Sequence, residues 1–298
     1  MIKDYLWGGT KLKTDYGFET DKDIAVEGWM LSCHKDGVNI VLNGEYKGKA
    51  LDEVLEIWGK ESLGKRASEF SYFPILIKLI DAKQKLSIQV HPDDEYALAV
   101  EGEYGKTEMW YVVDCEEGAE LIYGFKNRIS KEEFERRIKD NTLTEVCNFV
   151  PVNKGDVFFI SAGTLHAIGE GILIAEVQQN SNTTYRVSDY GRLGADGKPR
   201  ELHIEKALQV TECNAPVMPY GKVGKENIKD GIKERNLAQC DKFTSKTVSL
   251  SGKYVIEGEL TVKWTDGEIA SKKGDSIFIP AGLNVELNGQ AELLYSCV

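Results

Sequence analysis

Lys154-Gly-Asp-Val-Phe-Phe-Ile-Ser-Ala-Gly163 recurs in the same chain as Lys273-Gly-Asp-Ser-Ile-Phe-Ile-Pro-Ala-Gly282, with seven of ten positions identical. In each copy a Gly-Asp turn leads into a short apolar run, and a second glycine permits a tight turn after it. The constant spacing of the matching residues predicts two related β modules.

Outside this repeat, short alternating or β-branched runs broken by Gly, Asn and Asp fill much of the chain. Many short strands with turn signals are typical of antiparallel sandwiches or barrels. Strands are expected at 39–42, 86–91, 108–113, 157–160, 172–177, 254–262 and 277–280, and helical periodicity is expected at 51–59, 92–100 and 131–138. The sequence therefore predicts a mainly β protein with a few short helices.

Composition excludes several classes of protein. The chain has 298 residues, 42% of them hydrophobic, which is enough to form one or two hydrophobic cores. Its net charge of −11 disfavours the binding of polyanions. Neither nucleic acid nor a membrane is therefore an expected partner. The longest apolar stretch, 73–80, is interrupted by Lys78 and is too short to span a bilayer. A secretory signal is absent from the N-terminal residues and the six cysteines are scattered, so a cytoplasmic location is expected.

The two copies of the repeat differ in chemistry. His166 follows the first Ala-Gly pair by three residues, whereas Val285 stands at the matching place in the second copy. We therefore expect a site only in the first module. The predicted organisation is a catalytic domain at 1–215, a Gly-, Lys- and Asn-rich connection at 216–241, and the C-terminal part of a second, metal-free module at 242–298.

Three strand segments of the first module carry residues that could bind a metal. Gln89 and His91 share a face of one predicted strand, and Glu108 shares a face with Lys106 and Trp110 on the next. His166 shares a face with Thr164. Two histidines, a glutamate and a glutamine form a nitrogen and oxygen set that suits a divalent ion with open positions. His34 and His203 lack comparable neighbours and are expected to be structural.

A polar stretch follows His166. The residues from Gln178 to Tyr185 are all polar and lie between two strand-like pieces, as expected for a long loop or a surface hairpin. If the second piece is extended, Thr184, Arg186 and Ser188 share a face. Next to a metal, Arg186 could bind an anion.

Taken together, these motifs resemble a known family. Gln89-Val-His-Pro-Asp-Asp94, Gly105-Lys-Thr-Glu-Met-Trp110, Ala162-Gly-Thr-Leu-His-Ala167 and Asn180-Ser-Asn-Thr-Thr-Tyr-Arg186 have the order and spacing of the type I mannose-6-phosphate isomerases, in their short bacterial form. The resemblance is strong over the N-terminal 200 residues. It implies a cupin-type (jelly-roll) fold of two β-barrels, one zinc ion in the first barrel, and interconversion of mannose 6-phosphate and fructose 6-phosphate.

Specific residues acquire roles through this resemblance. It implies zinc ligation by Gln89, His91, Glu108 and His166, catalysis by Arg186, and contact of Lys78 and Lys106 with the hexose 6-phosphate. Asn182 stands where many members have an aspartate, so no role is assigned to it. The sequence does not predict an oligomeric state.

The expected reaction passes through an enediolate, because the proton at C2 of the sugar is too weakly acidic to leave unaided. The base could be a lysine whose pKa is lowered by burial, or Glu176. Two alternatives stay open: a cupin enzyme of another reaction, such as a glucose-6-phosphate isomerase or an oxygenase, and a non-catalytic module that binds a metal or a sugar phosphate.

Overall fold

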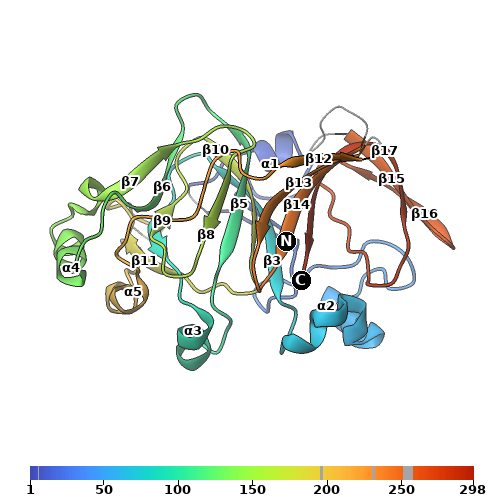
Figure 1. Cartoon of the computed structure of the whole chain (residues 1–298), viewed down its shortest axis with the longest axis horizontal. Helices are drawn as coiled ribbons and strands as arrows, with labels where there is room; N and C mark the ends of the chain where they lie inside the picture. The colour runs from blue at the N-terminus through green and yellow to red at the C-terminus, as the bar shows by residue number, and fades with distance from the viewer. Residues whose placement is uncertain (6, 195–196, 230–231, 251–257) are drawn as a thin grey trace.

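Two antiparallel sheets packed face to face form the first module of the computed structural model, which describes residues 1–5, 7–194, 197–229, 232–250 and 258–298 (Figure 1). The larger sheet has the order β1 (Ile2–Lys3), β2 (Glu27–Leu31), β3 (Ile75–Ala82), β10 (Ile172–Gln179), β5 (Glu108–Cys115) and β8 (Val157–Ile160). The smaller sheet has the order β11 (Tyr185–Ser188), β4 (Ile88–Val90), β9 (His166–Ala167), β6 (Glu120–Phe125) and β7 (Cys147–Pro151).

Apolar side chains pack on both faces of each of these sheets. Ile80, Val112 and Leu121 belong to the core between the sheets. The outer face of the smaller sheet packs against α4 (Lys131–Lys139) and α5 (Ile204–Val210), and the outer face of the larger sheet packs against α2 (Leu51–Trp58) and the second module. Burial on both faces explains why β3 and β10 read as nearly continuous apolar runs.

The helices are short, as predicted. The three expected ones are confirmed as α2, α3 (Asp94–Val100) and α4. Ser130 caps α4 by accepting a hydrogen bond from the Glu133 backbone, and Asp93 caps α3 in the same way. The sequence reading missed α1, α5 and the 3₁₀ helices, which are α1 (Lys11–Thr14), α5, η1 (Lys60–Leu63), η2 (Lys65–Glu69) and η3 (Leu143–Glu145).

The second module is built on one further antiparallel sheet in the described residues. Its order is β12 (Glu226–Lys229), β13 (Ile232–Gln239), β14 (Thr244–Leu250), β17 (Glu286–Cys297), β15 (Gly258–Trp264) and β16 (Gly267–Lys272). β12 and β13 fall within 216–241, which was expected as a connection, and β13 pairs with β14 along its length. The domain boundaries at 215 and 242 stay a prediction, and this pairing favours counting both strands with the second module.

The repeated segments have matching turns. Gly155 and Gly163 have φ values of 87° and 84°, and Gly274 and Gly282 have 88° and 84°. Such positive φ values favour glycine. The side chain of Asp156 accepts from the backbone of Asn153 at 2.8 Å, and Asp275 accepts from Lys272 at 2.9 Å. The prediction of two related β modules is therefore supported by backbone geometry as well as by identity.

Some predicted strands are wrong. Residues 277–280 form no strand, because Pro280 has no N–H and Phe278 packs instead against Trp58 and Phe73 of the first module. Ile40 forms an isolated bridge with Ala50 rather than a strand over 39–42. The beginning of the strand expected at 254–262 lies outside the described residues, and β15 starts at Gly258.

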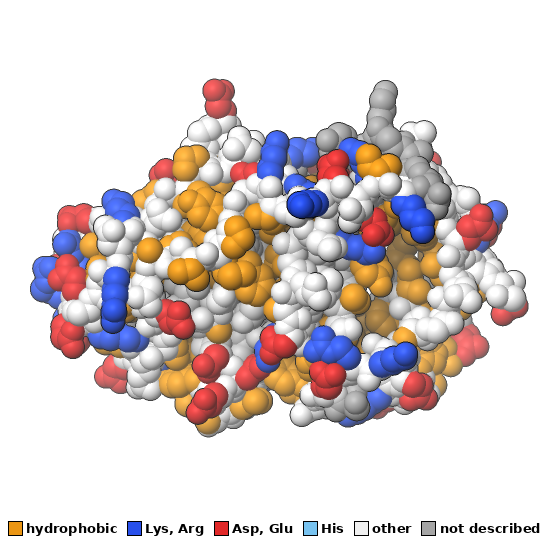
Figure 2. All heavy atoms as spheres, viewed as in Figure 1, with side chains coloured by type: hydrophobic (Ala, Val, Ile, Leu, Met, Phe, Trp, Pro, Cys, Tyr) orange, Lys and Arg blue, Asp and Glu red, His pale blue; other side chains and the backbone are white. Residues whose placement is uncertain are grey.

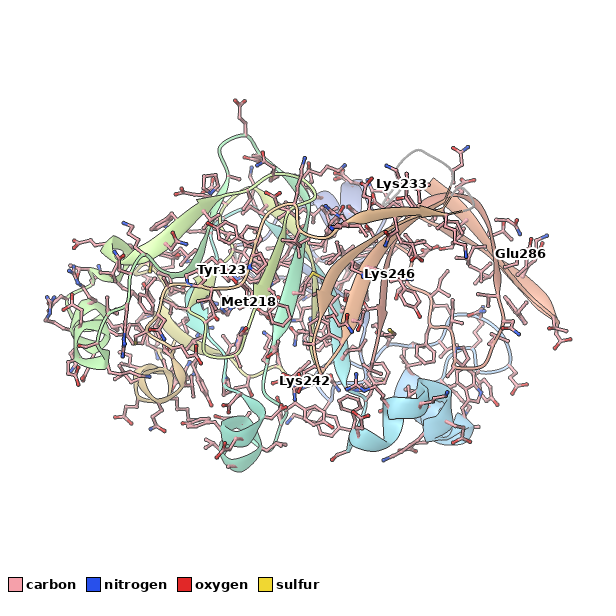
Figure 3. All side chains as sticks on the ribbon, viewed as in Figure 1. Tyr123, Met218, Lys233, Lys242, Lys246 and Glu286 are labelled. Atoms are coloured by element: carbon pink, nitrogen blue, oxygen red, sulfur yellow. The ribbon has the colours of Figure 1, made fainter. Side chains whose placement is uncertain are left out.

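The surface of the first module carries an apolar group of side chains in the view of Figure 2. Three apolar side chains of the segment before β12 are exposed on this module: Val217, Met218 and Tyr220, with exposed fractions of 92%, 41% and 46%. The ring of Tyr220 stacks on Phe158 and meets the ring of Tyr123 edge-on. Figure 3 labels Met218 just below Tyr123 in that view. The chain between α5 and β12 thus covers part of the first module. In the described residues no helix has both the length and the apolar character needed to cross a bilayer.

Candidate active site

One row of side chains crosses the inner face of the smaller sheet. Arg186 on β11 is paired with Gln89 on β4, and Gln89 is paired with His166 on β9. Directly opposed residues of antiparallel strands project to the same face. The neighbouring residues Val90 and Val187 face the opposite way, into the core beneath α4 and α5. The strand alternation that the sequence predicted is confirmed here.

A second row crosses the inner face of the larger sheet. Glu176 on β10 is paired with Lys78 on β3 and with Trp110 on β5. Two residues further along β10, Gln178 is paired with Glu108. The two rows face each other across the interior, so residues from six strands converge on one buried place.

His91, Glu108 and His166 meet at that place. The Nε2 atoms of the two histidines lie 3.2 Å apart, and Glu108 Oε1 lies 3.7 Å from His91 Nε2 and 3.3 Å from His166 Nε2. Each of the three residues is buried. Gln89 joins them, since its Nε2 lies 3.4 Å from His166 Nε2. An amide flip of Gln89 would place its oxygen toward the same point.

The two histidines of this cluster are in the neutral form that binds a metal cation. Burial lowers the pKa of His166 to about 4 and lowers the pKa of His91 well below its ordinary value, so both imidazoles are neutral at pH 7. His166 Nδ1 lies 2.8 Å from the carbonyl oxygen of Thr164 and donates to it, which leaves Nε2 as a free lone pair. Burial, and then the charge of Glu176, raises the pKa of Glu108.

The carboxylate of Glu108 is the strongest sign of a metal ion. Both of its oxygens are buried and neither has a hydrogen-bond partner. Burying a carboxylate without hydrogen bonds is costly, and the one ammonium beside it, that of Lys106, lies 3.6 Å from Oε2, too far for a hydrogen bond. Ligand atoms about 2.1 Å from a tetrahedral metal ion lie roughly 3.4 Å from one another. The observed separations of 3.2–3.7 Å agree with this value. His91, Glu108 and His166 could therefore hold a metal ion.

A buried ion pair lies beside the cluster. Lys78 Nζ is 3.0 Å from Glu176 Oε1, and Trp110 Nε1 donates to Glu176 Oε2 at 2.9 Å. Burial raises the pKa of Glu176, but the charges of Lys78 and Lys106 outweigh this effect, and the net direction is down. Burial likewise lowers the pKa of Lys78, but the charge of Glu176 outweighs it, and the net direction is up. Both groups are therefore ionised at neutral pH.

The two remaining predicted site residues lie on either side of the cluster. Lys106 is buried, with its Nζ 3.6 Å from Glu108 Oε2. Arg186 lies two strands away from His166 and donates from Nη1 to the backbone oxygen of Glu201 at 2.9 Å. All seven predicted site residues thus face the same interior, with Arg186 furthest along the row.

The other two histidines have the structural surroundings that the sequence predicted. His203 Nδ1 accepts from the backbone of Arg186 at 3.2 Å and joins β11 to the start of α5. His34 Nε2 lies 3.4 Å from Glu103 Oε1. Asn182 donates from Nδ2 to Asp36 Oδ2 at 2.8 Å. An aspartate at 182 would place two carboxylates against each other.

Sequence reasoning missed a hydrogen-bonded chain behind the cluster. Gln179 accepts from the Thr107 backbone at 3.0 Å and donates to Asp94 Oδ1 at 2.8 Å. Lys242, in the second module, lies 2.6 Å from Asp94 Oδ2. Figure 3 shows Lys242 where the two modules meet near α3. Because Thr107 lies between Lys106 and Glu108, this chain connects the second module to the site. No spacing in the sequence indicates it, since each link joins a different element.

A cupin-like protein with a candidate metal centre in one of two β modules is the class that this fold and cluster define. Comparisons with known proteins are consistent with that class. The family described as "Phosphomannose isomerase type I, catalytic domain" matches residues 1–128. Mannose-6-phosphate isomerase ManA of Bacillus subtilis (strain 168) is 41% identical over 99% of this chain and 96% of its own length.

Solved structures agree with these matches. The crystal structure of mannose 6-phosphate isomerase from Bacillus subtilis has a TM-score of 0.90 and 36% identity, covering 100% of this chain and 98% of that one. A variant of phosphomannose isomerase from Salmonella typhimurium has a TM-score of 0.78, covering 100% of this chain and 97% of that one; at 18% identity it shows the fold alone. The chain belongs to the type I mannose-6-phosphate isomerases and is an aldose–ketose isomerase. The family resemblance and the mainly β fold predicted from the sequence are thereby confirmed.

Proposed function

We propose that this chain interconverts mannose 6-phosphate and fructose 6-phosphate through an enediolate, with one zinc ion held by Gln89, His91, Glu108 and His166. The observation that carries the proposal is the buried Glu108 carboxylate, which has no hydrogen-bond partner and lies within 3.7 Å of two neutral imidazoles. A nitrogen and oxygen set without sulfur is typical of zinc sites that leave a position open for substrate. The chemistry that zinc supplies when bound is Lewis-acid stabilisation of negative charge on the sugar oxygens.

Positively charged side chains would also stabilise the negative charge that develops on the sugar oxygens. Lys106, 3.6 Å from Glu108, and Lys78, 3.0 Å from Glu176, are fixed in a buried interior where an ammonium group acts strongly on a developing oxyanion. Neither needs to move during the reaction. We assign both to substrate binding, and we assign Arg186 to catalysis at the end of the row.

Of Lys78 and Glu176, Glu176 is the better candidate for the base that moves the proton between C1 and C2. The sequence left a lysine with a lowered pKa as the alternative, but the pKa of Lys78 is raised by the charge of Glu176. A protonated lysine cannot accept a proton. The lowered pKa of Glu176 keeps a carboxylate in the interior that can accept one.

Metal removal tests the zinc assignment. Treatment with a chelator should abolish conversion of fructose 6-phosphate, and added zinc should restore it. Full activity in protein shown by metal analysis to be metal-free would contradict the assignment. A panel of hexose phosphates in a coupled assay would separate this reaction from that of a cupin enzyme acting on another sugar phosphate.

Substitution of Arg186 tests its role separately. Arg186→Ala should lower kcat by roughly 100- to 1,000-fold, as expected when one preorganised donor to developing charge is lost. Zinc content should stay near one per chain. Arg128→Ala, at an exposed position, is the matched control and should leave kcat unchanged. Loss of zinc in the Arg186 variant would mean that Arg186 is structural.

We also propose a reducing compartment, the cytoplasm, for this enzyme. All six cysteines, each of which the structure describes, are free thiols. Burial raises the pKa of Cys33 and of Cys147 to about 12, so neither forms a thiolate readily.

A further inference from the structure

The segment just before β5 carries Lys106 and is irregular in structure. Residues 104–107 belong to no helix or strand, since β5 begins at Glu108. Lys106 is buried, yet its Nζ lies 3.6 Å from Glu108 Oε2, too far for a hydrogen bond. The ammonium group is therefore placed by its packing and by the backbone of residue 106, so whatever fixes that backbone also fixes the charge.

Every backbone N–H group of this segment nevertheless has an acceptor. The N–H of Lys106 donates to the carbonyl oxygen of Pro92 at 2.9 Å. The other three donate to side chains: Tyr104 to the hydroxyl of Tyr72 at 2.8 Å, Gly105 to Asp94 Oδ1 at 2.8 Å, and Thr107 to Gln179 Oε1 at 3.0 Å. Side-chain acceptors take the place of a strand ladder here, so the path of the backbone depends on three particular residues.

Gln179 makes most of these contacts. It is 4% exposed and follows Gln178, which is paired with Glu108. Its backbone N–H donates to the carbonyl oxygen of Thr107 at 3.1 Å, and its Nε2 donates to Asp94 Oδ1 at 2.8 Å. The orientation of its amide is fixed, because the reverse orientation would place donor against donor at Thr107 and acceptor against acceptor at Asp94. Gln179 thus holds both backbone groups of Thr107 and joins them to α3.

Gly105 leaves this segment no room to shift. A Cβ at this position would lie 2.3 Å from the backbone carbonyl carbon of Asp93 and 2.5 Å from the backbone nitrogen of Asp94. The start of α3 therefore packs directly on the segment. Since closely packed backbone transmits a displacement instead of absorbing it, the loss of an acceptor at either end should move Lys106 as well.

We propose that Gln179, Asp94 and Tyr72 are positioning residues that hold Lys106 at the substrate. The assignment of Lys106 to substrate binding rests on the proposed function. A functional group must be held within about 0.5 Å of its working place, and a displacement of about 1 Å can cost up to a hundredfold in rate. Both polar atoms of the Gln179 side chain are engaged by Thr107 and Asp94, so Gln179 acts through Lys106 and not on the substrate.

A double-mutant cycle in the zinc-loaded enzyme tests this coupling. Gln179→Leu should lower kcat/KM for fructose 6-phosphate roughly 10-fold, because Lys106 loses its fixed place. The loss should divide between KM and kcat as it does in Lys106→Met. In the Lys106→Met background, Gln179→Leu should cost less than about twofold, since it has nothing left to position. Gln209→Leu, at an exposed position of α5, is the matched control and should leave kcat and KM unchanged.

Hydrogen exchange gives a readout that does not depend on activity. In the zinc-loaded protein, the backbone amides of residues 104–107 should exchange roughly 10-fold faster in Gln179→Leu than in the wild type, because Thr107 loses its acceptor and Asp94 loses a donor that orients it. Mass spectrometry of peptic peptides measures this rate. Zinc content should stay near one per chain, and its loss would mean that Gln179 supports the metal cluster instead of Lys106.

Three further outcomes would overturn the proposal: unchanged exchange, faster exchange with unchanged kcat/KM, or an equal loss of kcat/KM in the Lys106→Met background. If the wild-type enzyme did not convert fructose 6-phosphate, the proposed function would fail while the exchange rates still tested the positioning. Calorimetric titration of fructose 6-phosphate completes the cycle if Lys106→Met is too slow to assay. Should Gln179→Leu not fold, Tyr72→Phe removes the acceptor of Tyr104 at a 39% exposed position and answers the same question.

Discussion

The two copies of the repeated segment have the same turns and different strands. Gly155 and Gly274 begin them with nearly equal φ values, and Gly163 and Gly282 end them in the same way. Between the turns, the first copy forms β8, which pairs with β5, whereas residues 277–280 pair with no strand that the structure describes. The turn geometry is therefore dictated locally by glycine and aspartate, but the strand between the turns depends on having a neighbour.

The same comparison separates fold from chemistry. His166 lies on β9 within the metal cluster, while Val285 packs near Leu260, Val262 and Ala291 in the apolar core of the second module. The module with a site differs from the one without it in a few side chains on neighbouring strands, and not in the repeated segment itself. The second copy serves packing instead: Phe278 stacks on Trp58, and the Ala281 backbone donates to Ser62 at 2.8 Å.

Converting the first copy into the second at its decisive residue should have the largest effect. His166→Val replaces a buried imidazole by the residue found in the second copy, and zinc content should fall below one-tenth per chain. Activity should fall on the order of a thousandfold, because several kcal/mol of charge stabilisation depends on the ion. Metal analysis and the coupled isomerase assay measure both effects. Retention of zinc and activity would show that the cluster is not the metal centre.

The reverse change is the matched control. Val285→His adds an imidazole where the surroundings are apolar, and in the described residues no group of three metal-ligating side chains lies there. It should add no zinc and leave kcat unchanged. Binding of a second zinc ion per chain would mean that the repeated segment with one histidine is sufficient for a site, without the side chains on the surrounding strands.

Loss of the aromatic contact between the modules should have a moderate effect, on stability alone. Phe278 is half-buried, with its ring 6.4 Å from those of Trp58 and Phe73. Phe278→Ala should lower the free energy of unfolding by about 2 kcal/mol, less than for a fully buried ring. Ile277→Ala, at a 38% exposed neighbour, should cost less. Denaturant unfolding measures both variants. A changed KM in Phe278→Ala would mean that the second copy also shapes the site.

The smallest expected effect tests whether the second module supports catalysis. Lys242→Met breaks the ion pair with Asp94, whose other oxygen accepts from Gln179 behind Thr107. Since a partly exposed pair contributes about 0.5–1 kcal/mol, kcat/KM should fall only about two- to fivefold. Lys242→Arg should restore most of it. Lys246→Met, on β14 just after Lys242 in the chain and paired with Glu234, is the control, and an equal loss there would remove the special role of Lys242.

Local patterns were sufficient to predict much of the fold. Ser130 and Asp93 mark helix starts through contacts within one turn, and glycine with positive φ marks the repeated turns. The strand expected at 277–280 failed because Phe278 finds its partners in α2 and in the residues before β3, far away in the sequence. Alternation cannot reveal which neighbour an apolar side chain will meet.

The site, like the fold, has features that local patterns predict and contacts that they do not. Strand alternation was enough to place Gln89 with His91 and Lys106 with Glu108, and the structure brings these pairs together with His166. The partners that fix their protonation were not predictable. Thr164 holds His166 through a backbone oxygen, Trp110 holds Glu176 through a cross-strand contact, and Asp189 joins two arginines. None of these contacts has a periodic signature.

The central position of β10 has a consequence for synthesis of the chain. β10 lies between β3 and β5, yet it is made after both, so the larger sheet keeps a gap until residue 179 is available. A nascent chain that has released the residues up to β5 holds His91 and Glu108 but exposes the unpaired apolar edges of β3 and β5, which are prone to association. Metal capture should therefore come late in folding, and cells that lack holding chaperones should lose this enzyme to aggregation before its site exists.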